Sequence, residues 1–307
     1  GAAVLGSAGF FATISNIDEA QSFVDVLVRC RHRTLDTARG YGGGTSEEII
    51  SQLDLKDCKV DTKIYPSQPK AFADPGIKEL VAQSLKALAG TKIQTLYLQA
   101  PDRSTPFEET LSAINELHEA GHFELFGLSN FYSWEVAEVV TLCRFNGYVQ
   151  PTVYQGIYNM LDRVVEDERV LFPCLRKYGL HFAAYSPLGG GFLTGAYLEA
   201  GTSEAMEKNR RGERYVQRYS QTTPLLKKLK TIGDVHGMCL SEIAVRWLVH
   251  HSQMLSDDHG IVYGGRTVTQ LEAVLGYHAR GPLPEEIIQI VEGGWEEIKG
   301  RTPSYIF

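Results

Sequence analysis

Apolar and polar positions along the chain alternate between two spacings, one typical of helices and one typical of strands. Ala20, Phe23, Val24 and Leu27 recur at helical intervals after Asn16, a residue type that often caps a helix. We expect further helices from 46, at 77–88, 105–121, 133–145 and 170–178, from 224 to about 250, at 268–275 and within 285–299. Strands are expected between them, within 1–11 and at 34–36, 59–63, 96–99, 125–129, 152–155, 181–186 and 261–263.

This pattern repeats one strand–helix unit about eight times, without a linker or a low-complexity break. Such alternation implies parallel strands, and eight units favour a (β/α)8 TIM barrel, of class α/β, in a single domain, 1–307. We expect a long polar insertion, 201–223, between the seventh and eighth strands, and a C-terminal helix after the last unit. The alternative is a doubly wound sheet, but Gly6 and Gly9 lack the GxGxxG spacing of its dinucleotide-binding turn.

The composition excludes several classes of protein. Hydrophobic residues make up 43% of the chain and charged residues 22%, which is ordinary for a globular protein. The net charge of −7 makes nucleic acid and anionic membranes unexpected partners. Five cysteines, an odd number without a CxxC pair, indicate a reduced, cytoplasmic protein. No apolar run approaches the ~18 residues of a membrane span.

Nearly every expected strand ends in a polar group. The active sites of α/β barrels gather at the C-terminal ends of the strands. These ends carry Asp36 with Tyr41 in the next loop, Lys63, Gln99, Ser129 with Asn130, Gln155, Tyr185 with Ser186, and Gly264 with Arg266. A barrel with a purely structural role would not need so many polar groups at one rim.

Three of these residues can act as a chemical unit. Asp36 would hold Lys63 in its charged form, and Lys63 would lower the pKa of Tyr41 from its ordinary value of ~10. Tyr41 would then be a proton donor near neutral pH. Each residue also has a structural interpretation: Asp36 as a turn cap, Lys63 as a strand residue that reaches water, and Tyr41 as one of 15 tyrosines.

The segment 118–122, HEAGH, matches the HExxH pattern of zinc peptidases. That chemistry needs both histidines on one helix face, but Gly121 lies where the helix is expected to end. We therefore expect no metal site at His118 and His122.

The segment 36–42, DTARGYG, followed by Ser46 and Glu47, resembles the signature of the aldo-keto reductases. The segments 100–106, 151–159 and 184–195 are similar to the aflatoxin-aldehyde reductase branch of that family, as is the ending from Pro303 to Tyr305. The resemblance covers essentially the whole chain.

The resemblance implies an NADPH-dependent oxidoreductase that reduces aldehydes and ketones on a (β/α)8 barrel, in a branch that contains dimers. Tyr41 would be its proton donor, supported by Lys63 and Asp36. The implied cofactor-binding residues are Ser129, Asn130 and Gln155 for the nicotinamide carboxamide; Tyr185 for the nicotinamide ring; Ser186, Pro187, Leu188, Gly191, Leu193 and Gly195 for the pyrophosphate; and Gly264, Gly265, Arg266 and Gln270 for the adenosine phosphate. Arg218 matches a basic position of the branch and would contact either substrate or cofactor.

The chain departs from the family pattern at three positions. Gln99 stands where the family has its catalytic His, and Val274 where an Asn contacts the adenine. The chain ends in Phe307 rather than in an Arg that binds a substrate carboxylate. We therefore expect a larger, apolar carbonyl substrate, bound at Tyr41, Gln99 and Phe307.

Two other functions are compatible with these residues. The same site could reduce an enone or serve another biosynthetic redox step, because Gln99 replaces the His. The chain could also be a nucleotide-binding regulatory subunit with little turnover. The complete set of Asp36, Tyr41 and Lys63 favours an enzyme, because a binding module does not need all three.

Overall fold

The computed structural model describes residues 1–9, 12–167, 169–200 and 212–306. It contains two compact units, each built from several stretches of the chain. The first unit comprises 1–155, 173–183 and 264–271, and the second comprises 156–172, 184–263 and 272–307.

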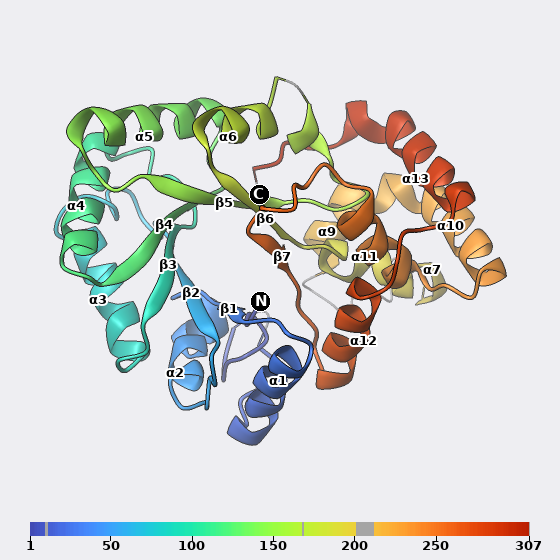
Figure 1. Ribbon diagram of the computed structural model, residues 1–307, viewed down its shortest axis with the longest axis horizontal. Helices are drawn as coiled ribbons and strands as arrows, with labels where there is room; N and C mark the ends of the chain where they lie inside the picture. Colours follow the sequence, from blue (N-terminus) through green and yellow to red (C-terminus); the bar gives the residue numbers. More distant parts are fainter. Residues whose placement is uncertain (10–11, 168, 201–211, 307) are drawn as a thin grey trace. The chain divides into compact units, whose positions relative to one another are not determined.

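Seven strands follow one another in chain order within one sheet (Figure 1). They are β1 (Thr34–Asp36), β2 (Lys59–Ile64), β3 (Ile93–Leu98), β4 (Phe123–Ser129), β5 (Pro151–Ile157), β6 (His181–Tyr185) and β7 (Gly260–Val262). The four pairings from β1 to β5 are parallel. Because helices alternate with these strands, the fold is the α/β alternation of the expected (β/α)8 barrel.

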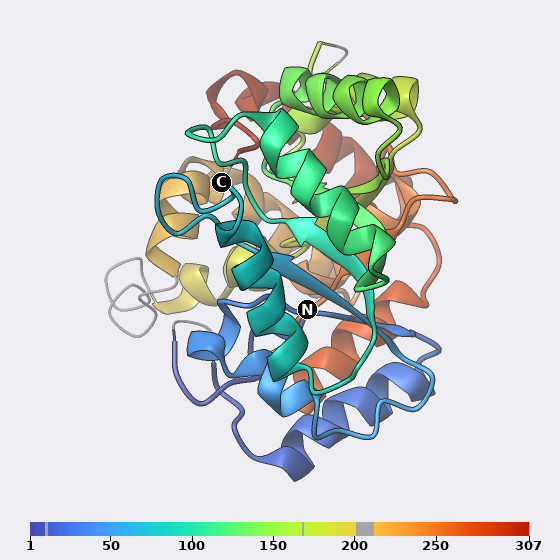
Figure 2. The same cartoon turned by 90° about the vertical axis from the view of Figure 1, so that its left-hand side faces the viewer.

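The helices of the first unit lie outside its strands, and Figure 2 shows α3 and α4 in front of the sheet. They are α1 (Ile17–Arg29), α2 (Ser46–Ile50), α3 (Gly76–Ala87), α4 (Phe107–Glu119), α5 (Ser133–Asn146) and most of α6 (Phe172–Tyr178). The Asn16 side chain caps α1 as expected, because its Oδ1 accepts a hydrogen bond from the Glu19 amide at 3.0 Å. Helix α4 ends at Glu119 and Gly121 has a φ of +77°, so His118 and His122 do not share a helix face.

The segment expected as the first strand, 1–11, is not one of the seven strands. Its described part makes one isolated bridge, from Leu5 to Ile14, and the Ala2 amide donates to the Asp36 carbonyl at 2.6 Å. Gly9 has a φ of +94°, which is outside the strand region and turns the chain. The expectation of a regular strand was therefore wrong, although the segment still contacts the end of β1.

The second unit is mainly helical. Its elements besides β7 are α7 (Ala196–Ala200), α9 (Gly212–Tyr219), α10 (Thr223–Val235), α11 (Leu240–His250) and α13 (Glu285–Ile298), with the 3-10 turns η2 (Val164–Glu166), η3 (Gly189–Thr194), η4 (Ser220–Thr222) and η5 (Lys299–Arg301). Helix α12 (Val268–His278) has residues in both units. Of the expected insertion, 201–211 lies outside the described residues, and the remainder is α9, η4 and the first residue of α10.

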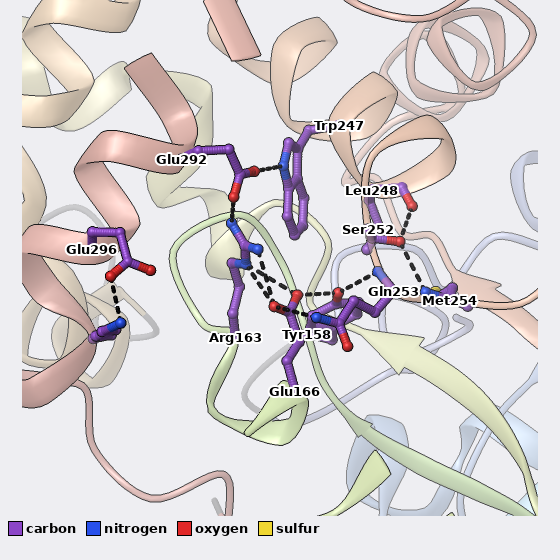
Figure 3. A network of polar contacts seen from close by, with 11 residues as sticks. Tyr158, Arg163, Glu166, Trp247, Leu248, Ser252, Gln253, Met254, Glu292 and Glu296 are labelled. Atoms are coloured by element: carbon purple, nitrogen blue, oxygen red, sulfur yellow. Dashed lines mark hydrogen bonds and ion pairs between the residues drawn. The ribbon is translucent and has the colours of Figure 1, made fainter. Parts of the chain in front are cut away.

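A network of charged and aromatic side chains joins distant segments of the second unit (Figure 3). Arg163 donates to both carboxylate oxygens of Glu166 at 3.0–3.1 Å and to Glu292 at 2.7 Å. The indole of Trp247 donates to the other oxygen of Glu292 at 3.0 Å. The Arg163 guanidinium also lies 4.8 Å from the Trp247 ring centroid. These contacts fix the loop after β5 to α11 and α13.

In the part of the chain that the structure describes, the helices are all too short or too polar to cross a membrane.

Candidate active site

A buried ion pair joins the ends of β1 and β2 in the first unit. The Lys63 ammonium donates to Asp36 Oδ1 at 2.5 Å and to the Thr37 carbonyl at 2.8 Å. The Lys63 side chain is 1% exposed and that of Asp36 is 8% exposed. The structure thus brings together two of the three residues that the sequence singled out for proton transfer.

Tyr41 lies beside this pair, on the 3-10 turn η1 (Tyr41–Gly44). Its ring centroid is 5.2 Å from the Lys63 ammonium, which is within cation–π range. The turn needs glycine at Gly42, which has a φ of +64° and whose added Cβ would lie 2.7 Å from the Leu5 carbonyl oxygen. This close backbone packing places the half-buried Tyr41 next to the ammonium.

The charge of Lys63 is maintained against its burial. Burial by itself lowers the pKa of the ammonium, but the charges of Asp36, Tyr41 and Asp61 and the hydrogen bond to Asp36 raise it above its ordinary value. Since the Tyr41 phenolate would stabilise the ammonium, the ammonium favours the phenolate by the same interaction. The pair can therefore act on the acidity of Tyr41, as expected from the sequence.

Gln155, near the end of β5, shares the same carboxylate. Its Nε2 donates to Asp36 Oδ1 at 2.8 Å, and its side chain is buried. Asp36 Oδ1 therefore accepts hydrogen bonds from β2 and from β5.

Gln99, Ser129 and Asn130 meet at the ends of β3 and β4. Asn130 Nδ2 donates to the Gln99 carbonyl at 2.8 Å and to Ser129 Oγ at 3.1 Å. Asn130 has a φ of +60°, a left-handed conformation that is uncommon outside glycine and often marks functional sites. The half-buried Gln99 side chain makes no hydrogen bond within the described part of the chain.

Gly264, Arg266 and Gln270 lie on the stretch of the first unit that leads into α12. The Gln270 side chain accepts a hydrogen bond from the Arg266 amide at 2.8 Å, and the Thr13 hydroxyl donates to the Arg266 carbonyl at 3.5 Å. Arg266 is exposed, and within the described residues its guanidinium forms no ion pair. A cation beside a helix N-terminus is suited to binding phosphate.

The segment from Tyr185 to Gly195 belongs, with Arg218, to the second unit. Ser186 has a φ of +57°, and its hydroxyl is 2.8 Å from that of Tyr215. In η3, a Cβ at Gly190 would lie 2.1 Å from the Tyr215 ring, whereas one at Gly191 would meet nothing within 4 Å among the described residues. The remaining expected residues here are Pro187 and Leu193, which are buried, Leu188, which is half-buried, and Gly195, which has a φ of +82°.

Arg218 on α9 is held by protein groups. Its guanidinium donates to Asp162 at 2.5 Å and to the Ser304 carbonyl at 2.8 Å. Burial lowers the pKa of Arg218, but the hydrogen bond and charge of Asp162 raise it above its ordinary value. Its observed partners thus come from the protein's own chain. Phe307, the expected substrate contact at the end of the chain, lies outside the described residues.

The sequence analysis missed Asp61, Tyr97 and Gly127. The Tyr97 ring centroid is 5.8 Å from the Lys63 ammonium, and a Cβ at Gly127 would lie 2.4 Å from the same ring. Strand periodicity was the available signal, because Asp61 precedes Lys63 by two residues and therefore faces the same side. Burial raises the pKa of Tyr97 far above its ordinary value, with the charges of Asp61 and Asp36 adding to it.

Comparisons with known proteins agree with this geometry. The model of the aldo/keto reductase family matches residues 2–296. An aldo-keto reductase of Pseudocercospora fijiensis is 40% identical over 296 residues, which covers 92% of this chain and 99% of that protein. Human aflatoxin B1 aldehyde reductase member 2 is 38% identical over 293 residues, covering 89% of this chain and 81% of that protein. The aldo-keto reductase pigE of Monascus ruber is 33% identical over 328 residues, covering 99% of this chain and 95% of that protein.

The chain therefore belongs to the aldo/keto reductase family and is an oxidoreductase that acts on carbonyl compounds.

Proposed function

We propose that the protein is an NADPH-dependent reductase of aldehydes or ketones, with Tyr41 as its proton donor. The observation that carries this proposal is the Lys63 ammonium, which is bonded to Asp36 at 2.5 Å and lies 5.2 Å from the centre of the Tyr41 ring. A charged group beside a phenol favours loss of the phenolic proton. Tyr41 can therefore protonate a carbonyl oxygen at neutral pH.

The residues present suit a nicotinamide dinucleotide. Gly191 leaves its backbone open to close approach, and Arg266 offers an exposed guanidinium at the start of α12. In the proposal, Ser129, Asn130 and Gln155 hold the carboxamide and Tyr185 stacks on the ring. The segment from Ser186 to Gly195 follows the pyrophosphate. The adenosine phosphate lies at Gly264, Arg266 and Gln270.

When bound, the reduced nicotinamide supplies a hydride to the carbonyl carbon. This chain's own residues complete the reduction. Tyr41 gives its proton to the carbonyl oxygen, Lys63 stabilises the resulting phenolate, and Asp36 keeps Lys63 charged. Gln99 can donate one hydrogen bond from its amide to the carbonyl oxygen.

The proposed substrate is a larger, apolar carbonyl compound. The similarity to proteins named aflatoxin B1 aldehyde reductase supports a bulky aldehyde. Gln99, Tyr41 and Phe307 are the proposed substrate contacts.

Replacement of Tyr41 by Phe tests the function. The variant keeps the ring beside Lys63 and removes the acidic hydroxyl. General-acid catalysis contributes about 10²–10⁴-fold, so kcat for aldehyde reduction should fall by that factor. NADPH oxidation with aromatic aldehydes, dialdehydes, quinones and enones measures it, and fluorescence titration should show unchanged NADPH binding.

Tyr65→Phe is the matched control, because Tyr65 follows β2 but is 52% exposed. Its kcat should equal that of the parent. If Tyr41→Phe retains full turnover with every substrate that the parent reduces, Tyr41 is not the proton donor.

A further inference from the structure

Asp61 is a buried carboxylate of β2 to which the proposed reaction gives no role. It is 2% exposed. It precedes Lys63 by two residues, so both side chains lie on one face of the strand. Its register neighbours are Asp36 on β1 and Thr95 on β3. A buried carboxylate lowers stability unless opposite charge or hydrogen bonds compensate it, so its position beside Lys63 requires a reason.

Two carboxylates act on the Lys63 ammonium. Asp36 bonds it directly, and Asp61 adds to the charges that raise the pKa of Lys63. Asp61 also raises the pKa of Tyr97, more strongly than Asp36 does, although burial is the largest cause. The charge of Asp61 thus acts both on the Lys63 ammonium of β2 and on its neighbour Tyr97 of β3.

The other groups around the Lys63 ammonium do not offset the negative charge of the two carboxylates. The phenol of Tyr41 on η1 and that of Tyr97 on β3 are its aromatic neighbours. Gln155 on β5 is uncharged. One lysine therefore stands against the two carboxylates Asp36 and Asp61.

Resting on the proposed reduction, we propose that Asp61 is a positioning residue: a second counter-charge to Lys63 that keeps the Tyr41 hydroxyl protonated to higher pH. An ammonium paired with only one carboxylate would draw the proton from Tyr41 more strongly. A second carboxylate weakens that pull. The reduction needs Tyr41 with its proton, so Asp61 extends the pH range in which the phenol can donate it.

The test compares Asp61→Asn with the parent chain. Loss of the negative charge favours the Tyr41 phenolate, so the pH at which kcat falls on the alkaline side should decrease by about one unit. Asp57→Asn is the matched control, because Asp57 precedes β2, is exposed and pairs with Arg33. Its pH profile should coincide with that of the parent.

A second measurement needs no turnover. Tyrosinate formation is followed by ultraviolet absorbance against pH, and the Tyr41 signal is the difference between each protein and its Tyr41→Phe counterpart. The Tyr41 midpoint should also decrease by about one unit in Asp61→Asn. If no carbonyl is reduced by the parent, the reductase proposal fails while this titration still decides the role of Asp61.

Asp61→Ser provides a smaller neutral side chain if the Asn variant does not fold. An unchanged alkaline limb and an unchanged Tyr41 midpoint in a folded neutral variant would overturn the proposal. A shift to higher pH would overturn it as well. An equal shift in Asp57→Asn would mean that the loss of any one negative charge lowers the Tyr41 midpoint, and that the position of Asp61 does not matter.

Discussion

Gln99 directly follows β3 and carries an amide at the position where the family resemblance implies an imidazole. Its backbone is fixed at both polar groups, because its amide donates to the Ile64 carbonyl and its carbonyl accepts from Asn130. The backbone of Gln99 is therefore held in place, while its side-chain amide remains available to a ligand. Gln can donate a hydrogen bond, but it does not titrate and cannot become a cation.

Gln99→His should therefore increase reduction of a simple aromatic aldehyde by about tenfold or more, which requires only ~1.4 kcal/mol at the transition state. An imidazole can donate a hydrogen bond and carry charge as the oxygen becomes negative. Steady-state kinetics of both proteins at saturating NADPH measure the difference. A His variant that is no faster with any aldehyde, beside a parent that reduces enones or quinones well, would favour the alternative reaction.

Asp36 and Lys63 could be singled out from the sequence because each is a charged residue at the end of an expected strand. A lysine and an aspartate that follow apolar runs are conspicuous, and the structure joins Lys63 and Asp36. Tyr97 gave no such signal, since a tyrosine within an apolar strand is ordinary core. Its position against Gly127 and Lys63 depends on strand register, which periodicity alone does not specify.

At the scale of elements, the start of α12 combines two attractions for a phosphate. The helix begins at Val268, and Arg266 precedes it by two residues with an exposed side chain. The unpaired amides of a first helical turn favour anions, and a guanidinium can bind phosphate through two parallel hydrogen bonds. The 2′-phosphate of NADPH is the group that this element would distinguish.

Arg266→Ala should weaken NADPH binding by about one to two orders of magnitude, because charge-assisted hydrogen bonds contribute ~1.5–3 kcal/mol. NADH lacks the 2′-phosphate, so its affinity should hardly change. Fluorescence titration of the variant with both cofactors supplies its own control. Equal losses for NADPH and NADH would remove Arg266 from the phosphate site.

The ends of helices could be predicted from the sequence where a capping residue lies directly beside the helix. Asn16 before α1 and Gly121 after α4 are examples, the latter in a left-handed conformation with a φ of +77°. The prediction of a first strand within 1–11 was wrong because it rested on apolar residues alone, which do not show that a segment pairs with another strand. Gly9 turns the chain there, and pairing partners far along the sequence decide which apolar runs become strands.

At the scale of the molecule, stability depends on contacts between segments that are far apart in the chain. The Arg163 guanidinium lies 4.8 Å from the ring centroid of Trp247 and 5.5 Å from that of Trp295. It also binds Glu166 and Glu292 (Figure 3). The Arg163 and Glu166 side chains are each only 8% exposed. Removal of the guanidinium would leave the carboxylate of Glu166 buried without its cation.

Arg163→Met should lower the free energy of unfolding of this unit by about 3–5 kcal/mol, since breaking a buried pair leaves one charge uncompensated. Urea unfolding followed by circular dichroism measures the loss. Arg169→Met removes an arginine that is 81% exposed and pairs with Asp167, and it should cost less than about 1 kcal/mol. Similar losses in the two variants would show that burial of the Arg163 pair does not matter.

The shared oxygen of Asp36 also has a consequence during synthesis of the chain. One of its hydrogen-bond donors, Lys63, follows 27 residues later, whereas the other, Gln155, follows 119 residues later. A nascent chain that emerges from the ribosome as far as β4 therefore contains Asp36, Tyr41 and Lys63 but cannot complete the cluster. Closing so long a loop costs entropy that local contacts do not repay, which slows folding. The cluster of Asp36, Lys63 and Gln155 should thus be among the last parts of the first unit to become ordered, after its helices have formed.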